Sequence, residues 1–546
     1  MKPPVERRVC SHALKPRAAK VEMKTTEQHW FDVFDRRVSR RDFITLSRNV
    51  AAYVALGALP APPGQRAARF RSNPFTLGVA SGDPLATGVV LWTRLDPATL
   101  NQAGATDARL AVGWEVAEDE GFRRTVRKGS NLALRGLGHS VHAEVDGLRP
   151  GRDYWYRFMA GGEVSATGRT RTAPAATASP DRFRFAFVSC QNYEHGYFTA
   201  YRRLASEDLD VVVHLGDYIY EKRFGQVQVR QHEAGEVFTL DQYRARYALY
   251  RSDPDLQAAH ARFPWIVTAD DHEVANNYAG VIADDEQSPE QMLLRRAAAY
   301  QAYYEFMPLR RSSMPAGPDM KIFRRLRFGG LVEFHVLDTR QYRSDQSCGD
   351  GRKPRCDDAL NRDRTMMGPG QEKWLMDGLR ASKARWNVVA NQVMIAQVAQ
   401  LRDGVRTFAM DKWDGYVEAR HRLMGFLAQA RPSNPVVITG DIHSNWVADL
   451  KPDFDDPSSP VVGTEFVGTS ITSGGDGNDS PGTDERALNP HVKFYNSRRG
   501  YVRATITPSL WTSDYRVLPY VSQPDAPIET RASFVVESGR PGAQPR

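Results

Sequence analysis

The segment that decides the fold runs from Val211 to Glu221 and reads VVVHLGDYIYE. Its run of apolar and β-branched residues is typical of a buried strand, which ends where the chain turns at Gly216. Asp217 and Tyr220 then stand in the loop after the carboxyl end of the strand, where open α/β sheets place their chemistry. A carboxylate there can bridge two cations, and the phenol three residues on can bind a strongly charged one. The competing interpretation is a strand followed by a capping Asp and a packed Tyr, so partners elsewhere in the chain must decide.

The overall composition fits a globular protein with a sizeable core and argues against a nucleic-acid-binding one. The chain has 546 residues, enough for two or three domains, and 41% of them are hydrophobic. The mean hydropathy is −0.51, and no apolar run is long enough to span a bilayer. The net charge is +8, but residues 1–61 hold 12 Lys and Arg against 6 Asp and Glu, whereas the other residues hold 61 against 59. Because the body is nearly neutral, we predict no nucleic-acid partner.

Residues 1–61 have the features of an export signal. Ser39-Arg40-Arg41-Asp42-Phe43 contains a paired arginine, an apolar stretch runs from Val50 to Leu59, and small residues follow for cleavage. This pattern resembles a twin-arginine signal, and Met23 is an alternative start. The competing interpretation is a basic helix start. The signal predicts a secreted, periplasmic or extracellular protein that the twin-arginine machinery exports already folded.

Residues 70–172 have the pattern of a β-sandwich. Short strand-like runs punctuated by Gly, Pro and Asp recur at even spacing. The predicted strands are Phe75–Ala80, Val89–Arg94, Leu110–Val116, Val141–Val145, Tyr154–Met159 and Val164–Thr172. Within them, the segment Leu148–Arg157 resembles a fibronectin type III turn and strand. The following segment Ala173–Asp181, rich in Ala and Pro, is predicted to be a linker.

From residue 182 to 520 strands alternate with helices, which predicts a mixed α/β domain. The predicted strands are Phe183–Val188, the central strand, Phe263–Thr268, Leu331–Leu337, Trp386–Ala390 and Pro435–Thr439. The predicted helices are Phe198–Glu207, Leu240–Tyr250, Gln291–Phe306, Gly370–Ala381 and Tyr416–Gln429. The chain from Val502 is predicted to be β-rich, with residues 521–546 as a C-terminal tail that is frayed from Ser538 onward.

Polar clusters follow several of these strands, and strands of shared layers would bring them to one rim. The collected residues are Cys190, Asp217, Tyr220, Asp271, His272, Asn391, Asp441 and His443. So many ionisable groups resist joint ionisation unless cations supply a countercharge. Taken singly, Cys190 fits a buried thiol, Asp271 a helix N-cap and Asp441 a turn cap. Their joint occurrence at strand ends favours a metal site.

The motifs together resemble one enzyme family. They are SCQ at 189–191, HLGDYIYE at 214–221, DDHE at 270–273 followed by NNY, DTRQYR at 338–343 and GDIHSNW at 440–446. This set resembles the PhoD-type alkaline phosphatases and phosphodiesterases of the calcineurin-like metallophosphoesterase superfamily, over roughly residues 70–520. The resemblance implies an α+β/α/β fold, with a fibronectin III-like sandwich before a four-layer domain of two packed β-sheets flanked by helices.

The resemblance also implies a centre that holds Fe³⁺ and Ca²⁺. By position, Asp217 would bridge the metals, and Cys190, Tyr220 and His443 would ligate iron. Calcium would be held by Asp271 and Asp441, with either Asn277 or Asn391. Thiolate and phenolate suit ferric iron, whereas carboxylate and amide oxygens suit calcium.

Two further pairs of residues carry predictions. Arg340 and Arg343 could grip phosphate oxygens, with Arg340 as the catalytic one, or could be surface charges. His272 would lie beside the leaving group as the second catalytic residue. Cys348 and Cys356 flank a polar loop, and in an exported protein they predict a disulfide rather than a zinc clip, since no nearby His completes such a site.

The predicted activity is hydrolysis of phosphomonoesters and diesters of small molecules by a metal-activated hydroxide, in a monomer. One alternative is a phosphodiesterase or phospholipase D-like enzyme on the same scaffold. Another is a surface binding protein with a degenerate site, which the intact set of ligand types argues against. A purple-acid-phosphatase-like enzyme is a weaker alternative, because the histidine-rich ligand pattern of those enzymes is missing from this sequence.

Overall fold

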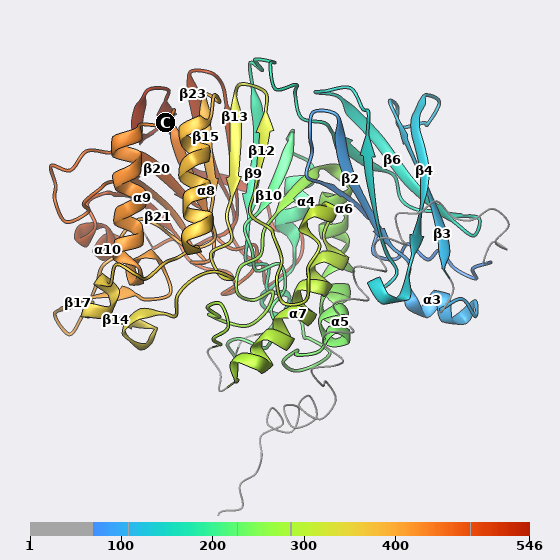
Figure 1. The fold of residues 1–546 in the computed structure, drawn as a ribbon, viewed down its shortest axis with the longest axis horizontal. Coiled ribbons are helices and arrows are strands. Elements are labelled where there is room, and N and C mark those ends of the chain that lie inside the picture. The colour runs from blue at the N-terminus through green and yellow to red at the C-terminus, as the bar shows by residue number, and fades with distance from the viewer. Residues whose placement is uncertain (1–68, 107–108, 227, 284–286, 481) are drawn as a thin grey trace, which may run out of the picture.

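Two β-sheets packed face to face form the centre of the molecule (Figure 1). The computed structural model describes residues 69–106, 109–226, 228–283, 287–480 and 482–546. The predicted export signal, 1–61, lies outside these residues. In spatial order, the ten-stranded sheet consists of β25 (Arg540–Pro545), β24 (Glu529–Glu537), β23 (Leu510–Leu518), β22 (Arg499–Ile506), β9 (Phe183–Val188), β10 (Val211–His214), β11 (Pro264–Val267), β1 (Val79–Gly82), β2 (Gly88–Arg94) and β5 (Ser140–Asp146).

The second sheet has seven strands. In spatial order they are β12 (Arg324–Phe328), β13 (Val332–Val336), β15 (Trp386–Ala390), β18 (Pro435–Thr439), β20 (Gly463–Val467), β19 (Asn445–Leu450) and β21 (Val492–Asn496). The two sheets meet through alternate side chains of each strand. In β9, Phe183, Phe185 and Phe187 point between the sheets, and the ring centroid of Phe185 lies 5.2 Å from that of Phe334 in β13. The intervening Ala186 points the other way, toward helices.

Helices cover the outer faces of both sheets (Figure 1). The ten-stranded sheet is covered by α4 (Thr199–Ala205), α5 (Leu240–Arg251), α6 (Pro254–Arg262) and α7 (Pro289–Phe306). The seven-stranded sheet is covered by α8 (Gly368–Ala381) and α9 (Val417–Ala430). A capping box starts α5 at Thr239 and α7 at Ser288. The prediction that Tyr243, Tyr247 and Tyr250 are packing residues is confirmed, since all three are buried.

The N-terminal region is built into the large sheet rather than standing apart from it. Its second layer consists of β4 (Thr125–Ala133), β3 (Leu110–Ala117), β6 (Asp153–Ala160), β7 (Glu163–Val164) and β8 (Gly168–Arg171), with the short helix α3 (Pro97–Gln102) before it. This layer packs on β1, β2 and β5 through an apolar core. Because β1 pairs in parallel with β11, Ser81 opposite Pro264, the N-terminal region covers the edge that β11 would otherwise expose. The sequence also missed β4, whose polar residues hide the alternation.

The prediction of a β-rich chain from Val502 is confirmed, but the prediction that residues from Ser538 onward are frayed was wrong. β24 and β25 form a hairpin that extends the ten-stranded sheet at its edge. Phe534 and Val536 of β24 are buried in the core between the sheets, and this apolar alternation explains the pairing. The remaining elements are a small sheet of β14 (Arg352–Lys353), β17 (Val405–Ala409) and β16 (Gln400–Arg402), and the helix α10 (Thr483–Leu488).

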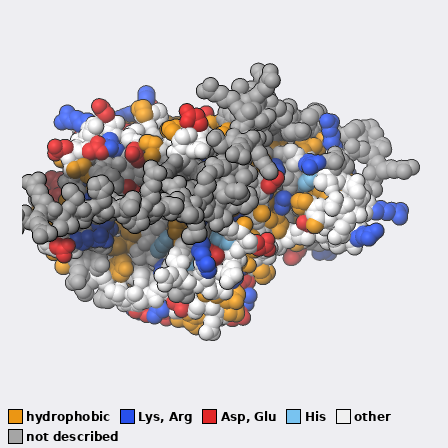
Figure 2. Space-filling view, turned by 90° about the horizontal axis from the view of Figure 1, so that it is seen from below, with side chains coloured by type: hydrophobic (Ala, Val, Ile, Leu, Met, Phe, Trp, Pro, Cys, Tyr) orange, Lys and Arg blue, Asp and Glu red, His pale blue; other side chains and the backbone are white. Residues whose placement is uncertain are grey.

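The surface carries charges of both signs. Figure 2 shows Lys and Arg side chains interspersed with Asp and Glu over the face seen from below. Within the described part of the chain, no helix combines the length and the apolar character needed to cross a membrane.

Candidate metal centre

The predicted site residues follow the carboxyl ends of two sets of parallel strands, one in each sheet. β9, β10 and β11 are mutually parallel, and so are β13, β15 and β18. The ends of the two sets meet closely. A Cβ at Gly440, after β18, would lie only 2.5 Å from Oγ of Ser189, after β9. Gly216 has a φ of +115°, and a Cβ there would lie 2.4 Å from Cβ of Asp270, so both glycines allow the approach.

The first cluster joins residues that are far apart in the sequence. Ligand atoms of Cys190, Asp217 and His443 lie within 4.8 Å of one another. The hydroxyl of Tyr220 lies 3.2 Å from Oδ2 of Asp217 and 3.2 Å from Nε2 of His443. It also accepts a hydrogen bond of 2.6 Å from Ser473. The structure therefore brings together the thiol, the carboxylate, the phenol and the imidazole that the sequence analysis grouped.

Two further clusters continue from the first. Asp217, Asp271 and His272 form one, and Asp270, Asp271 and Asp441 form the other, each with ligand atoms within 4.8 Å. Asp217 and Asp271 are shared between clusters, so the three form one continuous rim. Asp270 belongs to the DDHE motif at 270–273, but the motif alone predicted no role for it.

Four of the residues at this rim adopt a left-handed backbone conformation that side chains rarely favour. The φ angles are 58° at Cys190, 57° at Asp217, 63° at Asp441 and 55° at His443. Such residues cost about 1–3 kcal/mol each and collect at functional sites. The strained backbone is therefore an independent indication that these four residues belong to a functional site.

The protein alone disfavours ionisation of several side chains at the rim. Burial, and then the neighbouring charge of Asp217, raise the pKa of the Cys190 thiol and the Tyr220 phenol. Burial likewise raises the pKa of Asp217. For Asp271, burial acts in the same direction, but Arg340 and His272 outweigh it and hold the pKa below the ordinary value. Full ionisation of this donor set therefore needs more positive charge than the protein supplies.

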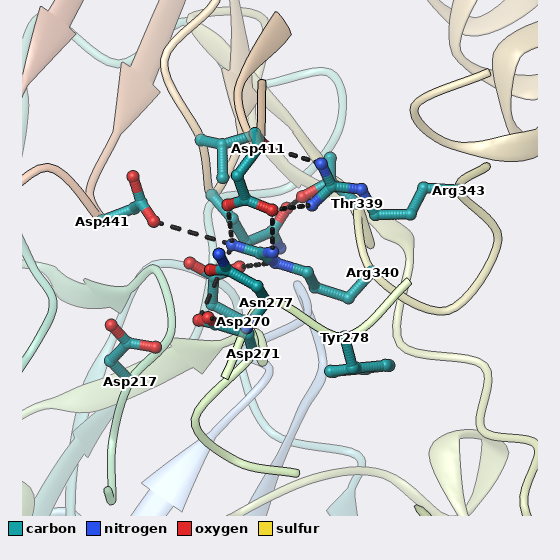
Figure 3. A network of polar contacts seen from close by, with 12 residues as sticks. Asp217, Asp270, Asp271, Asn277, Tyr278, Thr339, Arg340, Arg343, Asp411 and Asp441 are labelled. Carbon is teal, nitrogen blue, oxygen red and sulfur yellow. Dashed lines mark hydrogen bonds and ion pairs between the residues drawn. The ribbon is translucent and has the colours of Figure 1, made fainter. Parts of the chain in front are cut away.

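Arg340 is the internal cation of the site (Figure 3). Its Nε lies 2.5 Å from Oδ1 of Asp270, and its Nη1 and Nη2 donate to both oxygens of Asp411 at 2.8 and 3.0 Å. Its Nη2 also lies 3.6 Å from carboxylate oxygens of Asp271 and Asp441. The guanidinium fork that we predicted to grip phosphate is thus directed at protein carboxylates.

The surface-charge alternative for Arg340 and Arg343 was wrong. The two residues are 0% and 4% exposed. Arg343 donates from Nε to the hydroxyl of Tyr416 at 3.0 Å, and its Nη1 lies 3.1 Å from Asp411. Both arginines therefore hold Asp411, and burial with paired carboxylates explains why neither is at the surface.

The two asparagines differ in their surroundings. The amide nitrogen of Asn277 donates to Asp350 at 2.9 Å, and its backbone nitrogen donates to Asp271. Oδ1 of Asn391 is buried and has no hydrogen-bond partner among the described residues. Oδ1 of Asp217 is in the same condition. Buried unpaired oxygens are suited to a cation, and Asn391 follows β15, the neighbour of β18, whose end carries Asp441.

Several site residues had no role in the sequence analysis. Glu221 accepts a hydrogen bond of 2.7 Å from Nδ1 of His272. It is the last residue of the HLGDYIYE motif at 214–221, so its position in the motif could have pointed to it. The ammonium of Lys412 is paired with Asp441. Asp411 and Lys412 follow the antiparallel strand β17, and Ser473 lies in a long loop. No strand-end pattern marks these three, which explains the omission.

The structure joins Cys348 and Cys356 in a disulfide across eight residues of sequence separation. The loop that it closes carries Asp350, which accepts from the amide of Asn277. Through this hydrogen bond the disulfide-closed loop contacts Asn277 at the edge of the site.

Replacing both cysteines by serine is expected to lower the free energy of unfolding by about 2–3 kcal/mol, because the open loop gains chain entropy in the unfolded state. Urea unfolding of the oxidised wild type and the variant measures this difference. As a control, dithiothreitol should destabilise the wild type and leave the variant unchanged; an equal response of both would contradict the prediction.

Carboxylates, a thiol and imidazoles gathered at the ends of parallel strands, in a fold of two packed sheets, define an enzyme of the hydrolase class. Two family models match the chain: the PhoD-like phosphatase N-terminal domain over residues 59–174 and the PhoD-like phosphatase over residues 185–515. The chain belongs to the PhoD-like phosphatase family, and it is a phosphoric ester hydrolase.

Known proteins resemble the chain over nearly its whole length. It is 52% identical over 506 residues to alkaline phosphatase D of Bacillus subtilis (strain 168), a match that covers 91% of this chain and 85% of the relative. A solved structure of PhoD matches with a TM-score of 0.85 and 52% identity, covering 89% of this chain and 93% of the other.

Proposed function

We propose that this protein is an exported phosphatase that hydrolyses phosphomonoesters and diesters of small molecules with Fe³⁺ and Ca²⁺ at the rim. The observation that carries the proposal is the meeting of Cys190, Asp217 and His443 within 4.8 Å, from three strand ends remote in sequence. The name of the Bacillus relative supports the monoester activity.

The residues present fit the proposed metals. A thiol, a phenol and an imidazole around one carboxylate form a donor set for ferric iron, with Cys190, Tyr220, His443 and Asp217 as ligands. The carboxylates of Asp271 and Asp441 suit calcium. Both candidate amides have an engaged nitrogen, that of Asn277 on Asp350 and that of Asn391 on Val393, so it is the buried, unpaired Oδ1 of Asn391 that favours Asn391. Bound cations would supply the positive charge that stabilises the reacting phosphoryl group and activates water.

The chain's own groups prepare the site. Arg340 holds Asp270 and Asp411 in place and keeps Asp271 ionised. His272, 7% exposed, is oriented by Glu221, and neighbouring carboxylates raise its pKa despite burial. A protonated imidazole so held can give its proton to the leaving oxygen. We therefore keep His272 as the acid and assign Arg340 to positioning the carboxylates.

Metal analysis paired with an activity ratio tests the proposal. Mass spectrometry of the purified exported protein should find iron and calcium, and p-nitrophenyl phosphate should be hydrolysed along with its bis-ester. Activity on the bis-ester alone would favour the phosphodiesterase or phospholipase D-like alternative. Protein that holds neither metal and has no esterase activity would restore the binding-protein hypothesis.

Replacing Glu221 by Gln is expected to lower kcat about 10–100-fold, because His272 loses the partner that orients and charges it. If His272 protonates the leaving oxygen, the loss should be larger for an alkyl phosphate than for p-nitrophenyl phosphate, whose leaving group needs no proton. The matched control is Glu418→Gln, which breaks a surface Glu–His pair with His421. Equal losses for both substrates would contradict the role of His272.

The remaining proposals concern context. From the arginine pair at Arg40 and Arg41 we infer export by the twin-arginine machinery. We further propose that the protein is a monomer. We also propose that the N-terminal region is fibronectin III-like and that the catalytic part is the four-layer metallophosphoesterase fold; the helix–sheet–sheet–helix packing supports the latter. Deleting residues 1–61 should leave the protein in the cytoplasm, and light scattering of the purified protein tests the monomer.

A further inference from the structure

Ser473 is a buried residue at the metal centre whose hydroxyl has no role in the proposed function. It is 0% exposed and lies in the segment 468–475, which follows β20. Its Oγ lies 2.6 Å from the hydroxyl oxygen of Tyr220 and 2.7 Å from the carbonyl oxygen of Cys190. One hydroxyl thus contacts two of the proposed iron ligands, the phenol of the first and the backbone of the second.

The proton of Ser473 is available to Tyr220. A serine hydroxyl has one proton to donate. The carbonyl of Cys190 does not depend on it, because the backbone nitrogens of Thr472 and Ser473 donate to the same oxygen at 3.4 and 3.2 Å. A lone pair of Oγ is already engaged by the backbone nitrogen of Asn192 at 3.2 Å. The hydroxyl can therefore direct its proton at Tyr220 without leaving a buried acceptor unpaired.

The other partners of the Tyr220 hydroxyl are proposed ligands themselves. Oδ2 of Asp217 and Nε2 of His443 each lie 3.2 Å from it. An ionised carboxylate has no proton to donate, and neither has an imidazole nitrogen whose lone pair faces a cation. Among the described residues that contact this oxygen, Ser473 is therefore the one that can donate to it when a metal is bound.

The segment that carries Ser473 is fixed against the turn that follows β9. The backbone nitrogen of Ile471 donates to the carbonyl of Ser189 at 3.0 Å. Oγ1 of Thr472 donates to the carbonyl of Asn192 at 2.7 Å. These two acceptors stand on either side of the proposed thiolate ligand in the sequence. The position of Oγ is therefore set by the same turn that carries the thiol.

Arg499, the first residue of β22, fixes the end of the segment. Its Nε donates to the carbonyl of Gly475 at 2.6 Å, and its Nη2 donates to that of Gly474 at 3.3 Å. Its Nη1 donates to the carbonyl of His443. Because one buried guanidinium holds both the segment and the backbone of the imidazole ligand, Ser473 keeps its place relative to His443 as well.

We propose that Ser473 is a positioning residue for Tyr220: its hydroxyl donates to the phenolate oxygen that ligates iron and limits the electron density that the phenolate gives to the ion. The inference rests on the proposed function, because it takes Tyr220 as an iron ligand. The separation of 2.6 Å is typical of a hydrogen bond from a hydroxyl to an oxyanion. Such partners orient a ligand and tune the metal that it binds.

Visible absorption of the purified, iron-loaded protein tests the proposal, since a phenolate bound to ferric iron gives a charge-transfer band. Ser473→Ala should move this band to longer wavelength, because a phenolate without its donor releases an electron more easily. Competition with a chelator should show iron affinity about 10–100-fold lower, because the buried phenolate loses the hydrogen bond that stabilises its charge. The matched control is Thr472→Val, which removes a neighbouring buried hydroxyl that donates to Asn192 and should leave the wavelength unchanged.

The outcomes separate the role of Ser473 from the proposed iron site. A band of unchanged wavelength in Ser473→Ala that retains iron overturns the role of Ser473 and leaves the site intact. A wild type without the band, or with one that persists in Tyr220→Phe, contradicts the iron site and this inference together. If Ser473→Ala does not fold, resonance Raman spectra of the wild type decide: equilibration in D₂O should shift the C–O stretch of the phenolate, and an unshifted stretch overturns the proposal.

Discussion

Replacing Asp217 by Asn is expected to reduce hydrolysis of p-nitrophenyl phosphate on the order of 10³-fold or more. Asp217 is a member of two of the three clusters, so its loss disrupts both proposed ion positions. An amide also offers one oxygen where the carboxylate offers two. The bound iron and calcium, measured by mass spectrometry, should fall together with kcat.

The stability of the metal-free variant separates this effect from misfolding. Burial raises the pKa of Asp217, so its ionised form destabilises the metal-free fold at neutral and alkaline pH. After chelation, Asp217→Asn should therefore be at least as stable to urea at pH 8 as the wild type. The control Asp208→Asn changes an exposed Asp that pairs with Arg184 and should leave activity unchanged. Activity within tenfold of wild type, with both metals retained, would show that Asp217 is not a shared ligand.

The strand-end pattern predicted that residues following parallel strands come together, while their role as metal ligands stays a proposal. Cys190, Asp217, Asp271, Asn391 and Asp441 each come just after a run of apolar residues, and the ends of parallel strands share one edge of a sheet. Local pattern is sufficient there, because the strand fixes where the next side chain points. The left-handed conformation of Asp217 and Asp441 was not predictable, since only the close approach of neighbouring strand ends imposes it.

The rest of the site depends on contacts that no local pattern records. Asp411 follows a short antiparallel strand, and its contacts with the side chains of Arg340, Arg343 and Gln346 place it in the site. The same limit applies to the fold. The predicted sandwich has a core of its own, but the parallel pairing of β1 with β11 joins one of its layers to the catalytic sheet. That pairing spans more than 180 residues of sequence, and propensity carries no information about it.

Arg340 is expected to be the residue whose loss destabilises the metal-free protein most. Arg340→Met leaves the buried carboxylates of Asp270 and Asp271 without their paired arginine and leaves Asp411 with Arg343 alone. Breaking a buried ion pair from one side costs about 3–5 kcal/mol, and hydrolysis should fall with it because the carboxylates are no longer held in place. Urea unfolding after chelation measures the loss.

The pH dependence of that loss follows from the direction of the pKa shifts. In the wild type, Arg340 holds the pKa of Asp271 and Asp411 below the ordinary value, and these groups add stability that is lost as the pH falls toward their folded pKa. Without Arg340, the effect of burial is less compensated, so the pKa values of Asp271 and Asp411 rise. The destabilisation is then largest at neutral and alkaline pH, and the difference between variant and wild type should narrow from pH 8 to pH 5.

Two comparisons make this prediction specific to the buried network. Arg406→Met breaks a surface pair with Asp455 and should cost less than about 1 kcal/mol at either pH. Adding Asp411→Asn to Arg340→Met removes one of the carboxylate charges that Arg340 no longer balances, so the double variant should recover part of the stability at pH 8 and little at pH 5. A loss that is equal at both pH values, or a double variant less stable than Arg340→Met at pH 8, would mean that Arg340 acts through packing and not through its charge.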